Sequence, residues 1–337
     1  MHGINIGRWQ LLFDRVYKLQ VGQGTQGVEI TDLRISFEII KSSKKNPNRN
    51  RVQIWNLQRS TRQMCEKPDT RCILYAGYGE GDGPILIFTG GVVVAWSRYE
   101  LPDIVTEFEL TDGGKEIRDT AISVGYDKHV KSSQVLNDVS KKMGLPLNMP
   151  SNLIDRVWQN GLSFYGPART LLDKVTMAAG HEWSIQNGNI QVIEKGMVTT
   201  RQGIVISSDS GLVGSPERER KAYEGQATKP SKKGKNDPLK EWDGWKVKTL
   251  LMPQLNPGDR VEMDTRDVKG VFRCDYLTHR GDTHDGDWQS ELKIIDPAKP
   301  LHPTTSKGGT TPRGQTTKKS TTSTVDAGRV PIPSGVW

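Results

Sequence analysis

The chain has 337 residues, of which 34% are hydrophobic, 26% charged and 7% aromatic, so it can build roughly two or three globular domains and is too apolar to be wholly disordered. Its formal charge of +8 would attract nucleic acid or acidic partners, but much of the excess lies in two low-complexity stretches. No apolar run approaches the roughly 20 residues of a membrane helix, and the segment MHGINIGRWQ lacks the pattern of a secretory signal.

Strand-like runs dominate the chain from residue 9 to about 112, where apolar residues alternate and β-branched and aromatic residues are common. Glycine-rich turns are expected at 21–27 and 77–84, and one short helix at 57–67. The turn GYGEGDGP is read as a hairpin, because a strand and not a helix N-terminus follows it. These features predict a β-barrel or sandwich with one small helix over residues 1–120. The runs are RWQLLFDRVYKLQV, LRISFEIIKS, RVQIWNL, RCILYAGY, PILIFTGGVVVAW and DIVTEFEL.

The pattern changes to helical spacing in the middle of the chain. Residues 132–144 predict a helix with serine at its N-cap and a glycine stop, and residues 167–180 predict a second helix that opens with proline and closes with glycine. Residues 181–195 alternate on both sides of Asn187-Gly188, which is the strongest short-range hairpin signal. We therefore expect a small α/β module of two helices and a hairpin over residues 121–200.

Strand patterns resume in four further runs, which predict a second β domain over residues 201–296. A lysine-rich and proline-broken stretch at 226–243 interrupts it, and its composition predicts a flexible insertion. Residues 297–337 are rich in Thr, Lys, Gly and Pro, so they are expected to form a disordered C-terminal tail. The runs are GIVISSDSGLVGSPERERK, GWKVKTLLMPQLNPGDRVEMD, GVFRCDYLTHRG and DWQSELKIID.

The segment THRGDTHDGDW, residues 278–288, is the strongest candidate for metal chemistry. A catalytic zinc site takes about three His or carboxylate ligands and keeps one position open for water. The segment contains residues of these types, namely His279, Asp282, His284, Asp285 and Asp287. However, strand patterns flank it, its residue types are those that turns favour, and the other four histidines are scattered without an HExxH spacing. We interpret it as a hairpin loop and assign no catalytic, cofactor-binding or metal residue.

Two other features have structural interpretations. The basic run KSSKKNPNRNR at 41–51 lies between two strand patterns, and a solvated loop is favoured over a phosphate-binding site. Core or interface packing is the expected role of the spread-out tryptophans, including Trp55, Trp96, Trp183 and Trp288. The three cysteines, Cys65, Cys72 and Cys274, have no CxxC spacing and are expected to be reduced thiols.

Three segments together resemble baseplate hub proteins of contractile and long-tailed bacteriophages. The segment LRISFEIIKSSKKNPNRNRVQIWNLQRSTR resembles the first barrel of that family, and LSFYGPARTLLDKVTMAAGHEWSIQNGNIQVIEKG is similar to its central module. The segment SGLVGSPERER and the later strand runs resemble its second barrel. The matches cover residues 9 to about 296, and their order is more specific than any one of them.

The resemblance implies a mainly β fold with an α+β middle, in which two tail-tube-type β-barrel domains flank a small α/β module. It implies a homotrimer whose six barrels form a ring, with the strands of 84–96, 103–112, 245–264 and 271–295 forming two inner sheets around a channel. In that reading Asp282 caps the turn amides, while Gly281 and Trp288 serve turn geometry and packing.

The function implied is that of a structural, non-enzymatic hub of the virion, in the phage tail baseplate, assembled in the host bacterial cytoplasm. It would join the sixfold tail tube protein to the threefold central spike protein, contact other baseplate proteins and the tape measure protein, and let DNA pass without specific binding. No cofactor and no membrane anchor are expected. The alternatives are a cell-envelope-degrading tail enzyme with a metal site near residues 279–287, and a nucleic-acid-binding module that rests on the net charge alone.

Overall fold

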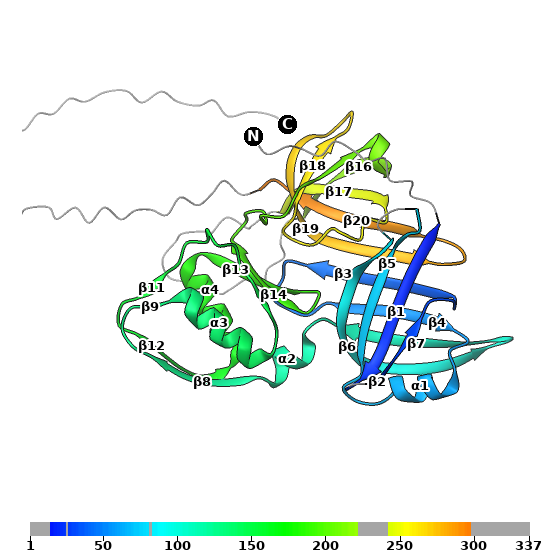
Figure 1. The fold of residues 1–337 in the computed structure, drawn as a ribbon. Helices are drawn as coiled ribbons and strands as arrows, with labels where there is room; N and C mark the ends of the chain where they lie inside the picture. Colours follow the sequence, from blue (N-terminus) through cyan, green and yellow to red (C-terminus); the bar gives the residue numbers. More distant parts are fainter. Residues whose placement is uncertain (1–13, 25, 81–82, 222–241, 298–337) are drawn as a thin grey trace, which may run out of the picture. The chain divides into compact units, whose positions relative to one another are not determined.

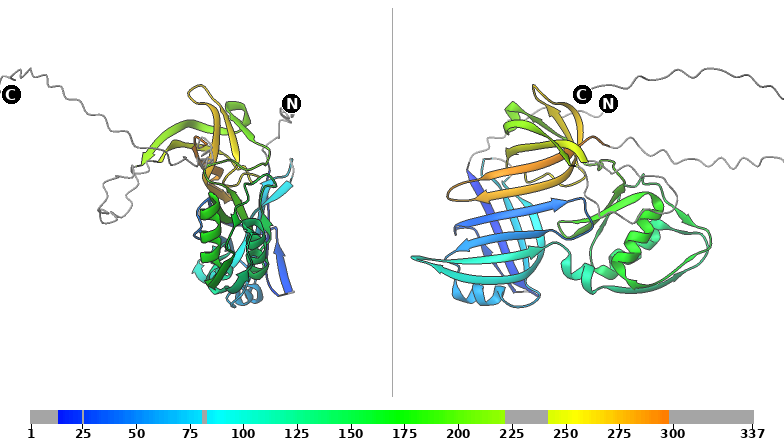
Figure 2. Two further views of the ribbon diagram at one scale, coloured as in Figure 1. Left: turned by 90° about the vertical axis from the view of Figure 1, so that its left-hand side faces the viewer. Right: turned by 180° about the vertical axis from the view of Figure 1, so that it is seen from behind.

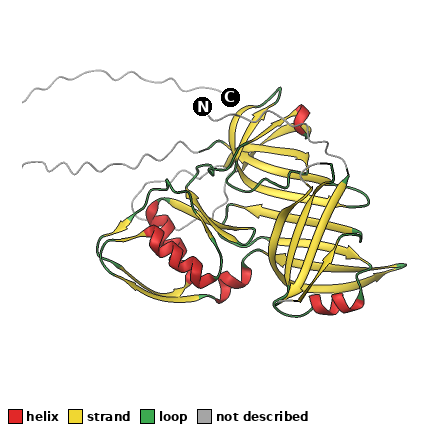
Figure 3. Ribbon diagram, viewed as in Figure 1, coloured by secondary structure: helices red, strands yellow, loops and turns green. Residues whose placement is uncertain are grey.

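The computed structural model describes residues 14–24, 26–80, 83–221 and 242–297 (Figure 1). Strands make up most of the described chain, and the larger helices lie together in its middle part (Figure 3). The predicted mainly β fold with an α+β middle is therefore confirmed.

The first β region comprises the elements from β1 to β7. The predicted runs correspond to β1 and to β3–β7, except that residues 8–13 of the first run lie outside the described residues, and β2 was not predicted. Both glycine-rich segments connect antiparallel neighbours, β1 with β2 and β5 with β6, as predicted. The predicted helix is α1, between β4 and β5. The bounds are β1 Arg15–Gln23, β2 Gln26–Ile30, β3 Ile35–Ser42, β4 Arg49–Trp55, α1 Arg59–Cys65, β5 Arg71–Tyr78, β6 Gly83–Glu100 and β7 Asp103–Thr111.

The middle module contains the two predicted helices, α3 and α4, and the predicted hairpin β13–β14. Asn187 and Gly188 have φ values of 50° and 74°, the left-handed pair that a two-residue type I′ turn requires. A short helix α2 and the antiparallel pair β8–β12 lie here too, and no sequence signal predicted them. The bounds are α2 Gly114–Asp119, β8 Ala121–Tyr126, β9 Val130–Lys131, α3 Ser132–Met143, β10 Leu147–Asn148, β11 Val157–Trp158, β12 Leu162–Pro167, α4 Ala168–Ala179, β13 His181–Gln186 and β14 Asn189–Glu194.

The predicted serine N-cap of α3 is wrong in detail. Lys131 occupies the N-cap position, and its side chain makes no capping hydrogen bond. The carboxylate of Asp155 instead accepts a hydrogen bond from the Ser133 amide at 3.0 Å and another from the Ser133 hydroxyl. An acceptor that lies 22 residues away in the chain satisfies this helix end, so no local sequence pattern could reveal it.

The second β region runs from β15 to β20. Strand β17 begins at Trp242, so the predicted insertion, 226–243, extended two residues too far. The rest of that insertion, and residues 298–337 of the predicted tail, lie outside the described residues. The bounds are β15 Ile204–Ser207, the 3₁₀ turn η1 Ser208–Ser210, β16 Leu212–Lys221, β17 Trp242–Leu250, β18 Arg260–Asp264, β19 Lys269–Asp282 and β20 Trp288–Ile295.

One sheet runs through both β regions, in the order β16-β17-β20-β19-β3-β4-β7-β6-β5-β1-β2. The link is the antiparallel pairing of β19 with β3, from Tyr276 opposite Ser42 to Asp282 opposite Ser36. The expectation of two separate inner sheets is therefore wrong. Strands β3 and β4 lie between the two sets of strands and join them into a single sheet. Each of the two linked strands would otherwise present an unpaired edge.

Three clusters of buried apolar side chains correspond to the first β region, the middle module and the second β region. Two side chains of the second region, Leu251 and Trp288, belong to the cluster of the first. The indole Nε1 of Trp288 donates a hydrogen bond to the Gly77 carbonyl at 3.2 Å. The two β regions therefore share packing as well as a sheet. Among the described helices, none has the length and apolarity needed to span a membrane.

Gly281 is the residue of β19 that this shared packing constrains most. A Cβ built there would lie 2.3 Å from Cζ of Phe37 and 2.8 Å from Cε3 of Trp288. We expect Gly281→Ala to lower the free energy of unfolding by about 1–3 kcal/mol, because the rings would have to move out of a filled core. Urea unfolding measures the change. The matched control is Gly125→Ala, whose added Cβ would meet nothing within 4 Å; equal effects of the two substitutions would contradict the expected clash.

Candidate functional site

The candidate metal segment is the hairpin that joins β19 to β20, as the flanking strand patterns predicted. His279 lies within β19, fully buried, with Nδ1 2.8 Å from the Ser290 hydroxyl. His284 lies exposed in the loop beyond the strand. In the part of the chain that the structure describes, no three His, Cys, Asp or Glu side chains are grouped so that they could hold a metal ion.

Asp282 organises the turn of this hairpin. Its Oδ1 accepts hydrogen bonds from the amides of His284, at 2.9 Å, and Asp285, at 3.3 Å, while Oδ2 lies 3.0 Å from the Arg34 guanidinium. Burial opposes ionisation of this carboxyl, but these hydrogen bonds outweigh it and hold the pKa of Asp282 below its ordinary value. The expected capping role of Asp282 is confirmed by these bonds.

Core packing, one of the two roles expected for the tryptophans, is seen for Trp183 and Trp288. Trp288 packs edge-on against Phe37, with ring centroids 5.4 Å apart, and Trp183 is buried with its indole nitrogen 3.0 Å from the Asp173 carboxylate. The ring of Trp55 carries the guanidinium of Arg34 over its face, 4.3 Å from the centroid. Trp96 differs, because 36% of it is exposed on β6.

A buried polar cluster connects the three parts of the molecule. Nζ of Lys41, on β3, donates a hydrogen bond to Oδ1 of Asn256 at 2.8 Å. The side-chain amide of Asn187 donates to the same oxygen at 3.3 Å. Asp112, after β7, accepts from the backbone amides of Asn187 and Gly188 at 3.0 and 3.3 Å. The β13–β14 turn is therefore held against both β regions.

Burial changes the charges of this cluster. It lowers the pKa of Lys41 to about 7 and raises the pKa of Asp112 to about 7, and attraction between the two groups opposes both changes. The sequence-based interpretation of residues 41–51 as a solvated loop is correct for the exposed residues 44–47 but wrong for Lys41. A lysine at the end of a strand is buried only when another part of the chain covers it, and no local pattern shows that.

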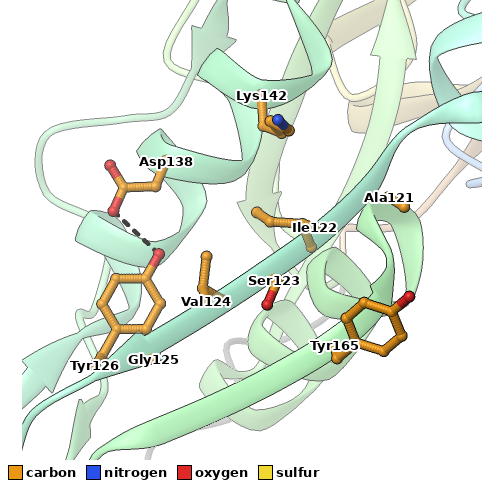
Figure 4. Close-up of a pocket in the computed structure, with 9 residues that line it drawn as sticks. All are labelled: Ala121, Ile122, Ser123, Val124, Gly125, Tyr126, Asp138, Lys142 and Tyr165. Atoms are coloured by element: carbon orange, nitrogen blue, oxygen red, sulfur yellow. Dashed lines mark hydrogen bonds between the residues drawn. The ribbon is translucent and has the colours of Figure 1, made fainter.

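An open groove of about 640 Å³ lies along β8 in the middle module (Figure 4). The strand itself forms one wall, and side chains from α3 and β12 complete the lining. The Tyr126 hydroxyl donates to the Asp138 carboxylate at 3.0 Å; burial first, and then the carboxylate, raises the pKa of that hydroxyl to about 12. The pair is therefore a structural contact rather than an acid–base couple near neutral pH. The lining residues are Ala121, Ile122, Ser123, Val124, Gly125, Tyr126, Asp138, Lys142 and Tyr165.

The outer half of β6 has the features of a protein-binding surface. Together with β7 it extends past the neighbouring strands (Figures 1 and 2). Beyond Val92 its backbone pairs only with β7 among the described residues, so its second edge is open. Large apolar side chains are exposed along it, including Val93 at 62% and Tyr99 at 74%. A hollow of about 240 Å³ lies between Val92–Ala95 and the end of α1. Open strand edges with exposed apolar residues are sites of strand addition.

The fold is similar to those of several solved structures. The chain is similar to the 43 kDa tail protein of prophage MuSo2 from Shewanella oneidensis, with a TM-score of 0.58 and 10% identity over 83% of this chain and 98% of that one. It is also similar to a tail protein from Neisseria meningitidis, with a TM-score of 0.56 and 9% identity over 82% and 96% of the two chains.

A third relative is the E. coli c3393 protein, described as a type VI secretion component with structural similarity to the T4 tail proteins gp27 and gp5 (TM-score 0.50, 10% identity, 83% and 76% covered). No protein-family model and no curated protein matches the sequence significantly. The chain therefore has the fold of these phage tail proteins, and the sequence resemblance predicted a fold of this kind.

Burial of Lys41 should make the free energy of unfolding depend on pH. Its folded pKa of about 7 lies below the ordinary 10.5, so the unfolded chain binds more protons between these values, and stability should rise with pH across that window. Lys41→Met should remove this rise. Urea unfolding between pH 7 and pH 10 tests it, with Lys142→Met at an exposed position as the control. Parallel pH profiles for wild type and Lys41→Met would contradict the burial of a titrating amine.

The turn carboxylate has the opposite titration behaviour. Because the folded pKa of Asp282 is lowered, its contribution is present above the ordinary value of 3.8 and is lost as pH falls through the folded pKa. Asp282→Asn should cost about 1–2 kcal/mol of unfolding free energy at pH 7 and progressively less below pH 4. The asparagine keeps one neutral oxygen for the two amides, but it loses the negative charge and the oxygen that pairs with Arg34. Asp285→Asn, in the same loop, should change little; a larger cost from Asp285→Asn would exclude the capping role.

Proposed function

We propose that the protein is a structural hub of a phage tail baseplate, a homotrimer that joins a sixfold tail tube to a threefold spike. The observation that carries this proposal is the pairing of β19 with β3, which makes two barrel-like regions of one chain into consecutive segments of a single sheet. Three chains with two such regions each would supply six regions, which is the number that a sixfold tube requires. Cyclic closure would then cover the remaining open edges.

The size of the resulting ring supports a channel. The strands from β16 to β6 in the sheet order number eight per chain, so three chains would contribute 24. At about 4.8 Å between strands, 24 strands give a circumference of about 115 Å and a ring roughly 37 Å across between backbones. The open face of these strands alternates acidic and basic side chains, among them Arg51, Arg98, Glu107, Arg280 and Glu291, which suits the passage of DNA without specific binding.

The other parts of the proposal follow from the same role. The partners are the tail tube protein, the central spike protein, other baseplate proteins and the tape measure protein, and the location is the virion after assembly in the host cytoplasm. The protein acts without catalysis or cofactor, and DNA is ejected through its channel. We propose domains at 1–120, 121–200 and 201–296, followed by the tail 297–337, in keeping with the three apolar clusters. Against the alternative of a metal-dependent envelope-degrading enzyme stands the burial of His279 away from the loop.

The oligomeric state tests the proposal. Sedimentation equilibrium should detect a species with three times the mass of one chain, either alone or after mixing with the tube and spike proteins, because the open edges are satisfied only in the ring. Negative-stain images of that species should show a threefold ring with a central channel. A chain that stays monomeric at high concentration beside both partners would exclude the hub proposal.

A further inference from the structure

The sheet contains an internal repeat of four strands. In the first β region the order is β3-β4-β7-β6, and in the second it is β16-β17-β20-β19. Each set consists of two antiparallel pairs of consecutive strands, β3–β4 and β6–β7 in the first set and β16–β17 and β19–β20 in the second. In each set the last strand in sequence, β7 or β20, lies next to the first pair. Strand β6 therefore corresponds to β19, and β3 corresponds to β16.

The correspondence can be assigned residue by residue. Pairing with the following strand shifts register between Val92 and Val94 in β6, and between Cys274 and Tyr276 in β19. The amide of Val92 donates to the Thr70 carbonyl at 2.9 Å, and the amide of Cys274 donates to the Asp259 carbonyl at 2.9 Å. From these anchors, Arg98 corresponds to Arg280, and the ends of the two strands, Glu100 and Asp282, coincide.

Matching ion pairs confirm the alignment. Arg98 lies 2.8 Å from Glu107 on β7, and Arg51 on β4 lies 2.8 Å from the same carboxylate. In the second β region, Glu291 on β20 holds the two corresponding cations, Arg280 at 3.5 Å and Lys246 at 3.2 Å. The same basic–acidic–basic row therefore crosses three strands twice in one chain.

One contact of this row occurs only once. Arg280 also reaches across to β3, where its Nη2 lies 2.7 Å from Glu38. Strand β3 pairs with the outer edge of β19 in the second β region. The corresponding edge of the outer half of β6 pairs with no strand among the described residues. The residue that corresponds to Glu38 in the second β region is Glu217. Glu38 is opposite Arg51 on β4. Glu217 is opposite Lys246 on β17, and Lys246 is the residue that corresponds to Arg51. Glu217 is exposed and makes no ion pair with the described residues.

We propose that β16 of a second copy of this chain pairs antiparallel with Val94–Glu100 of β6, with Glu217 of one copy in an ion pair with Arg98 of the next. This contact rests on the proposed hub and specifies how its subunits join. It would supply Arg98 with the cross-strand carboxylate that Arg280 already has. It would also cover the exposed apolar residues Val94 and Tyr99 of β6.

The occupant must be another copy and cannot be the same chain. Within one chain, β16 and β6 stand at opposite ends of an eight-strand run, with seven spacings between them, or roughly 33 Å along the sheet. Each copy offers one β16 edge and one β6 edge, so the contact is head-to-tail and closes as a ring.

Charge reversal tests the ion pair. Glu217→Arg should raise the chain concentration needed for half-assembly of the trimer at least tenfold, because it sets two cations against each other across the interface. Adding Arg98→Glu in the same chain should recover most of that loss. Asp209→Arg makes the same charge change at an exposed site of η1 in the same region and should leave assembly unchanged. If the double variant assembles no better than Glu217→Arg alone, the proposed pair is wrong.

Cysteine cross-linking tests the register independently of charge. The three native cysteines are buried, so new surface thiols can be oxidised selectively. A chain with both Arg98→Cys and Glu217→Cys should give covalent dimers and trimers, since cross-strand neighbours lie within disulfide range. Arg98→Cys with Arg218→Cys should give little cross-link, because a shift of one residue turns the side chain to the other face. A trimer seen by sedimentation but not linked by the first pair would refute this interface while leaving the hub intact; absence of any trimer would reject both.

Discussion

The antiparallel pairing of β3 with β19 is the contact on which the rest of the architecture depends. It joins strands more than 230 residues apart in the chain and satisfies two backbone edges that would otherwise be open. Side chains reinforce it on both faces. The Arg280–Glu38 ion pair lies on the open face, and Trp288 packs with Phe37 at the end of the pairing. Because of this pairing, the two barrel-like regions of one chain are neighbours in a fixed register.

The polar cluster around Lys41 and Asp112 extends the same link to the middle module. Its hydrogen bonds join β3, the segment after β7, the β13–β14 turn and the loop before β18. A buried amine and a buried carboxyl are costly unless each finds partners, so the cluster specifies one arrangement of these parts more than it adds net stability. The type I′ turn at Asn187-Gly188 presents the two amides that Asp112 accepts.

In the proposed hub role, a threefold spike meets a sixfold tube, and the internal repeat of four strands would resolve that mismatch. The basic–acidic–basic rows on the two halves of the sheet are alike, but only one of them is completed within the chain. The proposed contact between copies follows from this difference, because it would add to the row on β6 the carboxylate that Glu38 supplies to Arg280. The hairpin at 278–288, which looks like a metal site in the sequence, marks the completed copy.

The sequence by itself determined the local elements: alternation predicted the strands, glycine and proline delimited α3 and α4, and Asn187-Gly188 specified a hairpin, because these signals act between residues close in the chain. The resemblance to hub proteins also implied that Asp282 caps the turn amides, and its hydrogen bonds confirm this. Only the tertiary structure decided that Lys41 is buried, that Asp155 caps α3, and that Arg98 and Arg280 are equivalent. These depend on contacts between distant segments, whose partners no local pattern specifies.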